Sequence, residues 1–142
     1  MKNNVTTRFR FRGRDDQGHW RMGDLQLHGD MVWVGGNLVE AKTVGLDTGL
    51  NDVRTQPIFE GDIIDFVKDG ELCETPCVVR WHPYLTLFYI CFSHEENPRE
   101  SDTKASLGNM MFQHGYQVKI LGNIYDNPEL LPEHNPYMTI RG

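Results

Sequence analysis

The stretch IFEGDIIDFV, Ile58–Val67, decides how the fold is interpreted. In it the acid-glycine-acid sequence Glu60-Gly61-Asp62 leads directly into a short, mostly apolar run, IIDFV at 63–67. Glycine permits a bend or a close approach that a side chain would oppose, and an aspartate at a bend can accept backbone N–H bonds. The pattern therefore predicts that Gly61 and Asp62 shape the entry to a strand, with Asp65 facing solvent. The alternative is that Glu60 and Asp62 form a carboxylate pair that binds Mg²⁺ or divides acid and base roles, as in a metal-dependent hydrolase.

Two further strands are predicted after this stretch, CVVRWH at 77–82 and YLTLFYICF at 84–92. The second is apolar on both of its faces, because residues at alternate positions of a strand share a face. A strand of this kind must be covered twice, and an exposed one invites aggregation. The sequence thus predicts either that a barrel covers the strand within one chain or that a neighbouring subunit does, as in a homo-oligomer.

The remaining segments complete a pattern of many short strands with little helix. We expect hairpins at 9–28 and 31–44, a polar surface excursion at 45–56, a mobile charged loop at 93–104, a short helix at 105–113 and a last strand at 116–125. After that strand, Asn127 can cap a helical turn whose first position suits Pro128. We predict one domain over 1–142, with a hairpin region at 1–50, a barrel core at 57–131 and a tail at 132–142.

Composition indicates a soluble intracellular protein. The sequence has no run of about eighteen apolar residues that could span a bilayer, and its start lacks a secretory pattern. Its three cysteines cannot all pair within the chain, which argues against a secreted disulfide framework. We therefore expect reduced thiols and no contact with a membrane.

The charge is unevenly distributed along the chain. Residues 1–21 hold six Lys or Arg and two Asp, for +4, whereas residues 22–142 hold eight and eighteen, for −10. An acidic body repels a nucleic-acid backbone, because nonspecific affinity comes mostly from cations that displace phosphate counterions. Any contact with nucleic acid must therefore use the amino-terminal segment.

The segment RFRFRGR places arginines at alternate positions, namely Arg8, Arg10, Arg12 and Arg14. In a strand these side chains share one face, and the phenylalanines are expected to face a core. The guanidinium groups could hold phosphates, with Trp20 and Trp33 stacking on bases. The other interpretation is that the arginines pair with carboxylates of the acidic body or of a neighbouring subunit.

Cysteines and histidines suggest two further chemistries, and neither is convincing. Cys73 and Cys77 with His82 or His94 could bind zinc, but no second pair has a comparable spacing and a proline separates the two cysteines. Cys91 with His82 could form a nucleophile and base, but nothing marks an electropositive setting, and Cys91 is expected to face the core. We predict no catalytic residue, no metal site and no cofactor.

Three ordered blocks of the sequence resemble one known family. They are FRFRGRDDQGHWRMGDL near the amino terminus, TGLNDVRTQPIFEGDIIDF in the middle and VKILGNIYDNPELL near the carboxyl terminus. In these features the chain resembles the YopX-like proteins of bacteriophages and prophages. It departs from the family pattern in the spacer NDVRTQP, which lacks the usual glycine and lysines, and in the acidic insertion near 93–104.

The resemblance implies an all-β, barrel-like fold with short helical additions, a tendency to assemble and an origin in a phage or prophage of a bacterium, which places the expected protein in the cytoplasm of the bacterial host cell. It supplies no catalytic residues. The positions that we expect to serve architecture are Gly49, Gly61, Asp62, Gly122, Asn123, Asn127 and Pro128. The leading hypothesis is a non-enzymatic, oligomeric module that binds an unknown protein partner, and nucleic-acid binding through the arginines is the alternative.

Overall fold

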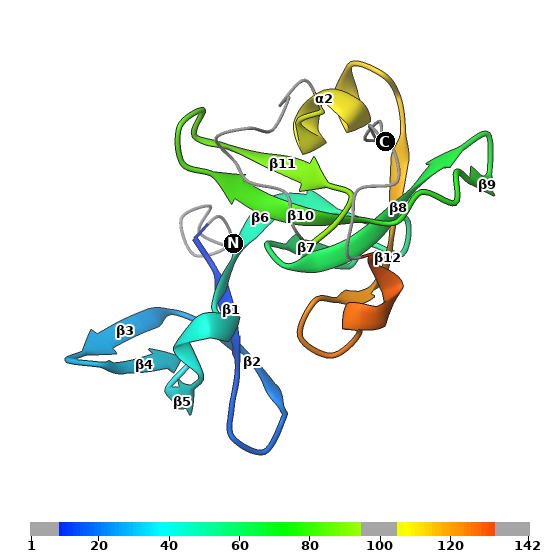
Figure 1. Cartoon of the computed structure of the whole chain (residues 1–142). Coiled ribbons are helices and arrows are strands. Elements are labelled where there is room, and N and C mark those ends of the chain that lie inside the picture. The colour runs from blue at the N-terminus through cyan, green and yellow to red at the C-terminus, as the bar shows by residue number, and fades with distance from the viewer. Residues whose placement is uncertain (1–8, 95–104, 133–142) are drawn as a thin grey trace, which may run out of the picture. The chain divides into compact units, whose positions relative to one another are not determined.

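The computed structural model describes residues 9–94 and 105–132 and is built mostly of β-strands with little helix (Figure 1). This confirms the predicted all-β fold class. The chain divides into two compact units, one formed by 1–50 with 57–60 and the other by 51–56 with 61–142. The expectation of a single domain over 1–142 stays a prediction, and each unit is described by itself.

The first unit contains a four-stranded sheet whose strands follow the order β2-β1-β6-β7. Its strands are β1 (Phe11–Arg14), β2 (Trp20–Gly23), β6 (Gly45–Asn51) and β7 (Pro57–Phe59). The prediction of a polar surface loop over 45–56 is wrong for residues 45–51, because these residues form strand β6 of the sheet. This polar strand is accommodated because the buried Asp47 accepts bonds from Arg10 and from the N–H of Gly49, at 2.8 Å each.

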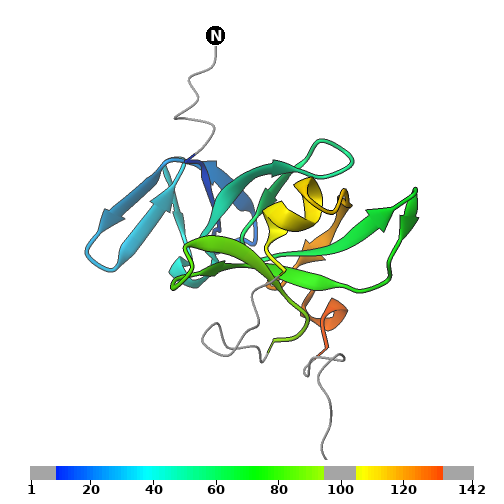
Figure 2. The same ribbon diagram turned by 90° about the horizontal axis from the view of Figure 1, so that it is seen from above.

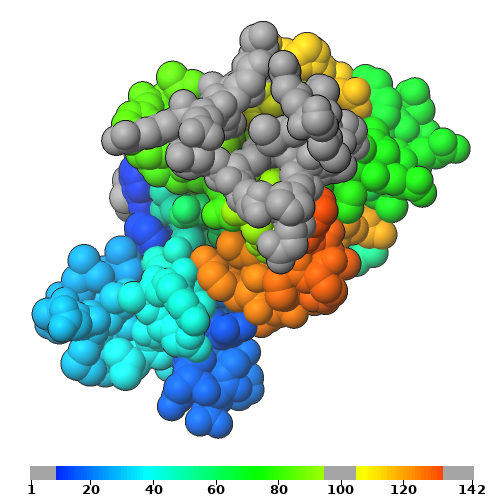
Figure 3. Space-filling view, in the orientation of Figure 1, coloured from blue at the N-terminus to red at the C-terminus, as the bar shows by residue number. Residues whose placement is uncertain are grey.

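A second, three-stranded sheet of the first unit follows the order β3-β4-β5. Its strands are β3 (Leu25–His28), β4 (Met31–Val34) and β5 (Asn37–Val39), followed by the 3-10 helix η1 (Ala41–Thr43). The predicted hairpin in 31–44 is confirmed, because β4 and β5 pair in antiparallel register around Gly35 and Gly36. Figure 3 shows the surface that this sheet presents, in light blue.

The second unit is a five-stranded sheet that curls into a half-barrel. Its strands are β8 (Asp62–Lys68), β9 (Glu71–Leu72), β10 (Cys77–His82), β11 (Leu87–Cys91) and β12 (Gln117–Asn123). The path runs β11-β10-β8-β12, and β9 extends β8 as a hairpin (Figure 2). The register of β12 shifts between Ile120 and Gly122, an irregularity that bends a strand and increases its twist.

Strand β11, predicted to be apolar on both faces, is buried within the chain over its second half, and its first two residues, Leu87 and Phe88, are half-buried. Tyr89, Ile90 and Cys91 are all buried, and Tyr89 and Cys91 belong to a core cluster with Ile63 and Val78. The helix α2 (Leu107–Phe112) packs against β11 and begins where the Oγ of its capping serine, Ser106, accepts the N–H of Asn109. Coverage within one chain thus accounts for Tyr89–Cys91, whereas Leu85 is exposed and Leu87 and Phe88 are half-buried, so the choice between the two predicted ways to cover the whole strand stays a prediction.

The chain continues from β12 into a tight corner and the 3-10 helix η2 (Pro128–Leu130). Asn127 precedes this helix as predicted, but its side chain does not cap it. Its Oδ1 instead accepts the N–H of Asn123 at 3.1 Å. Gly122 must be a glycine for this arrangement, because a Cβ there would overlap Asn127 Oδ1.

Two sequence predictions concern segments outside the described residues. They are Arg8 of the arginine segment and most of the charged loop predicted at 93–104. Within the described part of the chain, no helix is long and apolar enough to cross a membrane.

Candidate functional site

The arginine segment has the predicted alternation, but both faces of β1 are covered: Arg12 is buried on one, and Gly13 is buried against Val39 on the other. Arg12 is only 8% exposed, whereas Phe9 is 51% exposed, so the expectation that the phenylalanines face a core is wrong there. The guanidinium of Arg12 lies 4.7 Å from the ring centre of Trp20 and 5.0 Å from that of Phe59. Two aromatic faces thus replace water around a cation, which makes its burial tolerable.

The neighbouring arginines are held by carboxylates of the same unit. Arg10 donates through Nε and Nη2 to Asp47 Oδ2 at 3.2 and 2.8 Å. The Nε of Arg14 lies 3.9 Å from Glu40. Pairing with carboxylates is thus the interpretation of this segment that the geometry favours, over open phosphate contacts.

The tryptophans predicted to stack on bases are not open platforms. Trp20 is covered by Arg12 and also lies 6.0 Å from the guanidinium of Arg14. Trp33 is half-buried in β4. The segment therefore resembles a packed cation–aromatic cluster more than a nucleic-acid groove.

The turn between β1 and β2 is organised by Asp15, which also contacts Arg21 of β2. Asp15 Oδ1 accepts the N–H groups of Gln17 and His19, and its Oδ2 accepts Arg21 Nε at 2.9 Å. These donors hold the pKa of Asp15 below its ordinary value, with the His19 N–H as the largest cause, while desolvation opposes the shift. The carboxylate thus fixes the β1–β2 turn.

The acid-glycine-acid corner has the architecture that the sequence predicts for Gly61. Gly61 adopts a φ of +94°, a left-handed conformation that favours glycine. Its N–H donates to Val79 O at 2.8 Å, and its carbonyl accepts the N–H of Ile124 at 3.0 Å. Asp62 is buried at the start of β8, opposite Asn123 in β12.

Asp65 does not face solvent, and that prediction is wrong. It is 2% exposed, and its two oxygens accept the N–H groups of Glu74 and Thr75 at 2.9 and 3.1 Å. A carboxylate with both oxygens so occupied can be buried, because hydrogen bonds replace its lost hydration. Its role is to hold the segment between β9 and β10.

The cysteines and histidines lie in separate structural settings. Cys73 is exposed, whereas Cys77 and Cys91 are buried, which confirms the core-facing position predicted for Cys91. The Nδ1 of the buried His82 accepts the N–H groups of Tyr84 and Leu85, at 3.2 and 3.0 Å. In residues 9–94 and 105–132, no three His, Cys, Asp or Glu side chains are grouped so that they could hold a metal ion.

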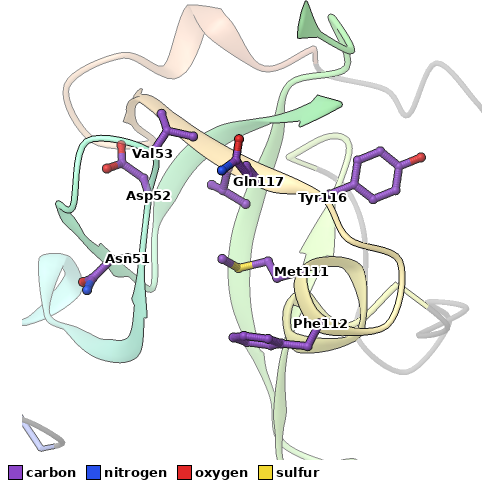
Figure 4. A pocket seen from close by; sticks show the side chains of 8 residues that line it. Asn51, Asp52, Val53, Met111, Phe112, Tyr116 and Gln117 are labelled. Atoms are coloured by element: carbon purple, nitrogen blue, oxygen red, sulfur yellow. The ribbon is translucent and has the colours of Figure 1, made fainter. Parts of the chain in front are cut away.

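Sequence reasoning missed a surface hollow of about 260 Å³ in the second unit (Figure 4). Its lining comes from the segment before β7, from α2 and from the start of β12, and consists of Asn51, Asp52, Val53, Met111, Phe112, Tyr116, Gln117 and Val118. Figure 4 shows Met111 and Phe112 pointing from α2 toward the segment that carries Asn51. The sequence did contain a signal for it. The short helix ends in the apolar residues MMF, 110–112, and so short a helix cannot bury all three side chains.

The walls of the hollow are fixed by hydrogen bonds. Asp52 Oδ1 accepts the N–H groups of Arg54 and Gln56 at 2.9 Å each, and its Oδ2 accepts that of Ile120 at 3.2 Å. The N–H of Val53 donates to Val118 O at 2.8 Å. The segment 51–56 is thereby tied to the edge strand β12.

Comparison with known proteins gives one family. A family model described as YopX protein matches residues 6–132, which is most of the chain. No curated protein matches the chain.

Proposed function

The chain belongs to the YopX family, and we propose that it is a phage- or prophage-derived accessory protein of the bacterial cytoplasm that acts as a non-enzymatic interaction module. Its work is to bind copies of itself and another protein. The proposal rests on how the polar side chains are used and on which apolar side chains stay exposed.

The observation that carries the proposal is the structural use of the groups that could do chemistry. Asp47, Asp52 and Asp65 are buried and accept bonds from backbone N–H groups or an arginine, and His82 accepts two backbone N–H groups. A general base needs a lone pair that can reach a substrate proton, and these side chains are buried and already accept hydrogen bonds from the protein itself. Binding therefore suits these surfaces better than turnover does.

Self-association is proposed to use the three-stranded sheet of the first unit. Leu27, Met31 and Leu38 are exposed on it, and Asp30 is the one Asp, Glu, Lys or Arg in 25–39. In the sheet order of the described residues, β3 and β5 are edge strands. An uncharged edge with exposed apolar side chains is a template for pairing with another chain.

Self-association is tested by the mass of the full chain in solution. Sedimentation velocity at micromolar concentration is expected to give an oligomer, and Leu27→Glu is expected to shift it toward monomer. The matched control is Leu72→Glu, which places the same charge on an exposed leucine of β9 in the second unit. A monomer for the unmodified chain at every concentration would overturn the assembly part.

The partner part is tested by crosslinking a tagged full chain in cells that express it from its own gene. A discrete adduct with a second protein is expected. A chain that forms no adduct in those cells would count against an interaction module.

A further inference from the structure

We propose that two copies of this chain pair through β3, in antiparallel orientation, about a twofold axis that passes between their Gln26 residues. This inference rests on the proposed self-association and names the strand, the orientation and the register that it uses. It depends on the unused backbone groups of β3 and on which side chains face each other in that register.

The outer edge of β3 carries backbone groups that the chain itself does not use. The N–H of Gly35 donates to Asp24 O at 2.9 Å, so these two residues form a hydrogen-bonded pair beside the β3–β4 ladder. Such pairs alternate with non-hydrogen-bonded ones, which are therefore the pairs that Leu25 and Leu27 make with β4. The N–H and C=O groups of Leu25 and Leu27 thus point away from β4. Within residues 9–94 and 105–132, no strand lies beside this edge and no hydrogen bond uses these groups (Figure 1).

The other edge strand of this sheet, β5, offers less. Val34 and Asn37 flank the two-residue turn of the β4–β5 hairpin, and alternation from that pair leaves only Leu38 of β5 with its N–H and C=O pointing outward. The residue after β5, Glu40, already donates its N–H to Arg14 O at 2.8 Å. Strand β3 is therefore the edge that can best add another strand.

One register lets a second copy use all the free groups of β3. When Leu25 lies opposite the partner's Leu27, the symmetry places Leu27 opposite the partner's Leu25, and each of these pairs exchanges two N–H···O=C bonds. An axis at Leu27 would place Leu25 opposite the partner's Gly29, which lies in the turn after β3. An axis at Leu25 would place Leu27 opposite the partner's Gly23, which already pairs with β1. Either shift loses bonds that the register centred on Gln26 makes.

The uncharged side chains of β3 match in this register. Leu27 is 65% exposed in one copy and comes opposite the partner's half-buried Leu25, so two apolar cross-strand pairs form. On the other face of the strand, the exposed Gln26 side chains of the two copies meet at the axis. Cross-strand pairs of this kind are the units that stabilise a sheet.

The charged side chains match as well. Asp24, exposed directly before β3, comes opposite the partner's exposed His28, and the symmetry repeats this pair. A histidine ring can donate a hydrogen bond to a carboxylate and is positive when protonated. Neither side chain takes part in an ion pair within the residues that the structure describes. An axis at Leu27 would instead place Asp24 opposite the partner's Asp30, and like charges in that position destabilise a sheet. The charge pattern therefore fits a second copy of this chain in one register.

A cysteine at the axis tests the register directly. In a non-hydrogen-bonded antiparallel pair the two Cα atoms are about 4.5 Å apart, within the range that a disulfide spans. Gln26→Cys is made together with Cys73→Ser, because Cys73 is an exposed thiol. With oxidised glutathione as oxidant, this variant is expected to give a disulfide-linked dimer.

The matched control is Met31→Cys in the same Cys73→Ser background. Met31 is exposed on β4, so in the proposed dimer it is separated from the partner's Met31 by at least three strand spacings, about 14 Å. That separation is too long for a disulfide, and the control is expected to form at least about tenfold less dimer in the same time.

Charge exchange tests the same register without a covalent bond. Asp24→Lys and His28→Glu are each expected to weaken dimerisation severalfold in sedimentation velocity, because each replaces an acid–base pair by two groups that repel. The double variant is expected to recover most of the loss, since the new lysine and glutamate face each other across the axis. Within one chain, positions 24 and 28 are about 13 Å apart along the strand, so this recovery cannot arise inside one copy.

Several results would overturn the proposed pairing. They are a dimer yield from Gln26→Cys no higher than from Met31→Cys, a double charge variant weaker than both single variants, or a faster disulfide from Leu27→Cys than from Gln26→Cys. In an oxidised extract of cells that express Gln26→Cys with Cys73→Ser, a disulfide to a different protein in place of the dimer would make a partner's strand the occupant. That result also contradicts the proposal.

Sedimentation velocity of the unmodified chain separates this failure from that of the proposed self-association. An oligomer that forms while Gln26→Cys fails to crosslink keeps self-association and removes β3 as its strand. A chain that stays monomeric at every concentration removes both. An oligomer whose two copies crosslink through Gln26→Cys supports both.

Discussion

Asp52 illustrates how single side chains hold the loops of this protein. Its two oxygens accept three backbone N–H groups, two within its own turn and one from Ile120 in β12. Asp15, Asp65 and His82 act in the same way on other turns. Buried polar groups are stable only when they are so satisfied, which explains why acids that look solvent-facing in the sequence are buried.

Arg12 offers the clearest residue-level test. Its buried guanidinium lies between Trp20 and Phe59, and its Nη2 reaches the carbonyl of Glu60 at 3.5 Å. Arg12→Ala is expected to lower the free energy of unfolding by about 2–4 kcal/mol, because cation–aromatic contact and packing are both lost. Arg12→Lys is expected to lose about 1–2 kcal/mol, since an ammonium stacks less well than a planar guanidinium. Urea unfolding followed by tryptophan fluorescence measures both.

Arg54→Ala is the control for Arg12, because Arg54 is exposed and has no ion pair in the part of the chain that the structure describes. It is expected to change the free energy of unfolding by less than about 0.5 kcal/mol. Equal effects of the two substitutions would show that the Arg12 cluster does not stabilise the fold.

Asp15 gives a pH-dependent prediction. Its pKa is lowered in the folded chain, chiefly by the His19 N–H and then by Arg21, so the ionised carboxylate stabilises the fold. This contribution is full above the ordinary value of 3.8 and is lost as the pH falls through the lower folded-state pKa. Asp15→Asn is therefore expected to be less stable than the original chain near neutral pH and equally stable in strong acid. Urea unfolding at both pH values tests this, and a difference that persists in strong acid would contradict it.

At the scale of elements, alternation of apolar residues predicted β10, β11 and the last strand, and turn residues predicted the β4–β5 hairpin. Strand β6 was missed because GLDTGLN has the composition of a loop. It is a strand because β1 pairs with it and Arg10 neutralises Asp47, two tertiary contacts that a local pattern does not contain. The same limit explains why the burial of Arg12 was not predicted. The alternation of arginines along the strand was clear in the sequence, but the side of the strand that is buried depends on the contact with Phe59 in β7.

The corner between β12 and η2 can be tested as one element. Gly122→Ala is expected to cost about 2 kcal/mol of unfolding free energy, because the new Cβ overlaps Asn127 Oδ1. Asn127→Ala alone is expected to cost about 1 kcal/mol, since Asn123 N–H loses its acceptor. The double variant is expected to cost less than the sum, because removing the amide also removes the overlap. Additive losses in thermal or urea unfolding would contradict the close approach.

At the scale of the whole molecule, the sequence predicted the family and the mainly β architecture but not the hollow. The three ordered blocks all lie within residues 6–132, the range that the family model matches. The hollow arises where residues 51–53 meet residues 111–118, a contact between segments about sixty residues apart that no periodicity encodes. The exposure of Phe112 likewise depends on how little of α2 the sheet covers.

The surface proposed for self-association is tested by one substitution and its matched control. Leu27→Glu places a charge on the β3–β4–β5 sheet and is expected to lower the oligomer mass in sedimentation velocity, because a carboxylate buried between paired edges would lose its hydration. Leu72→Glu places the same charge on an exposed leucine of β9 and is expected to leave the mass unchanged. An equal loss of mass in both variants, with the far-ultraviolet circular dichroism intact, would mean that the added charge itself weakens assembly. In that case the three-stranded sheet would not be the surface through which copies of the chain meet.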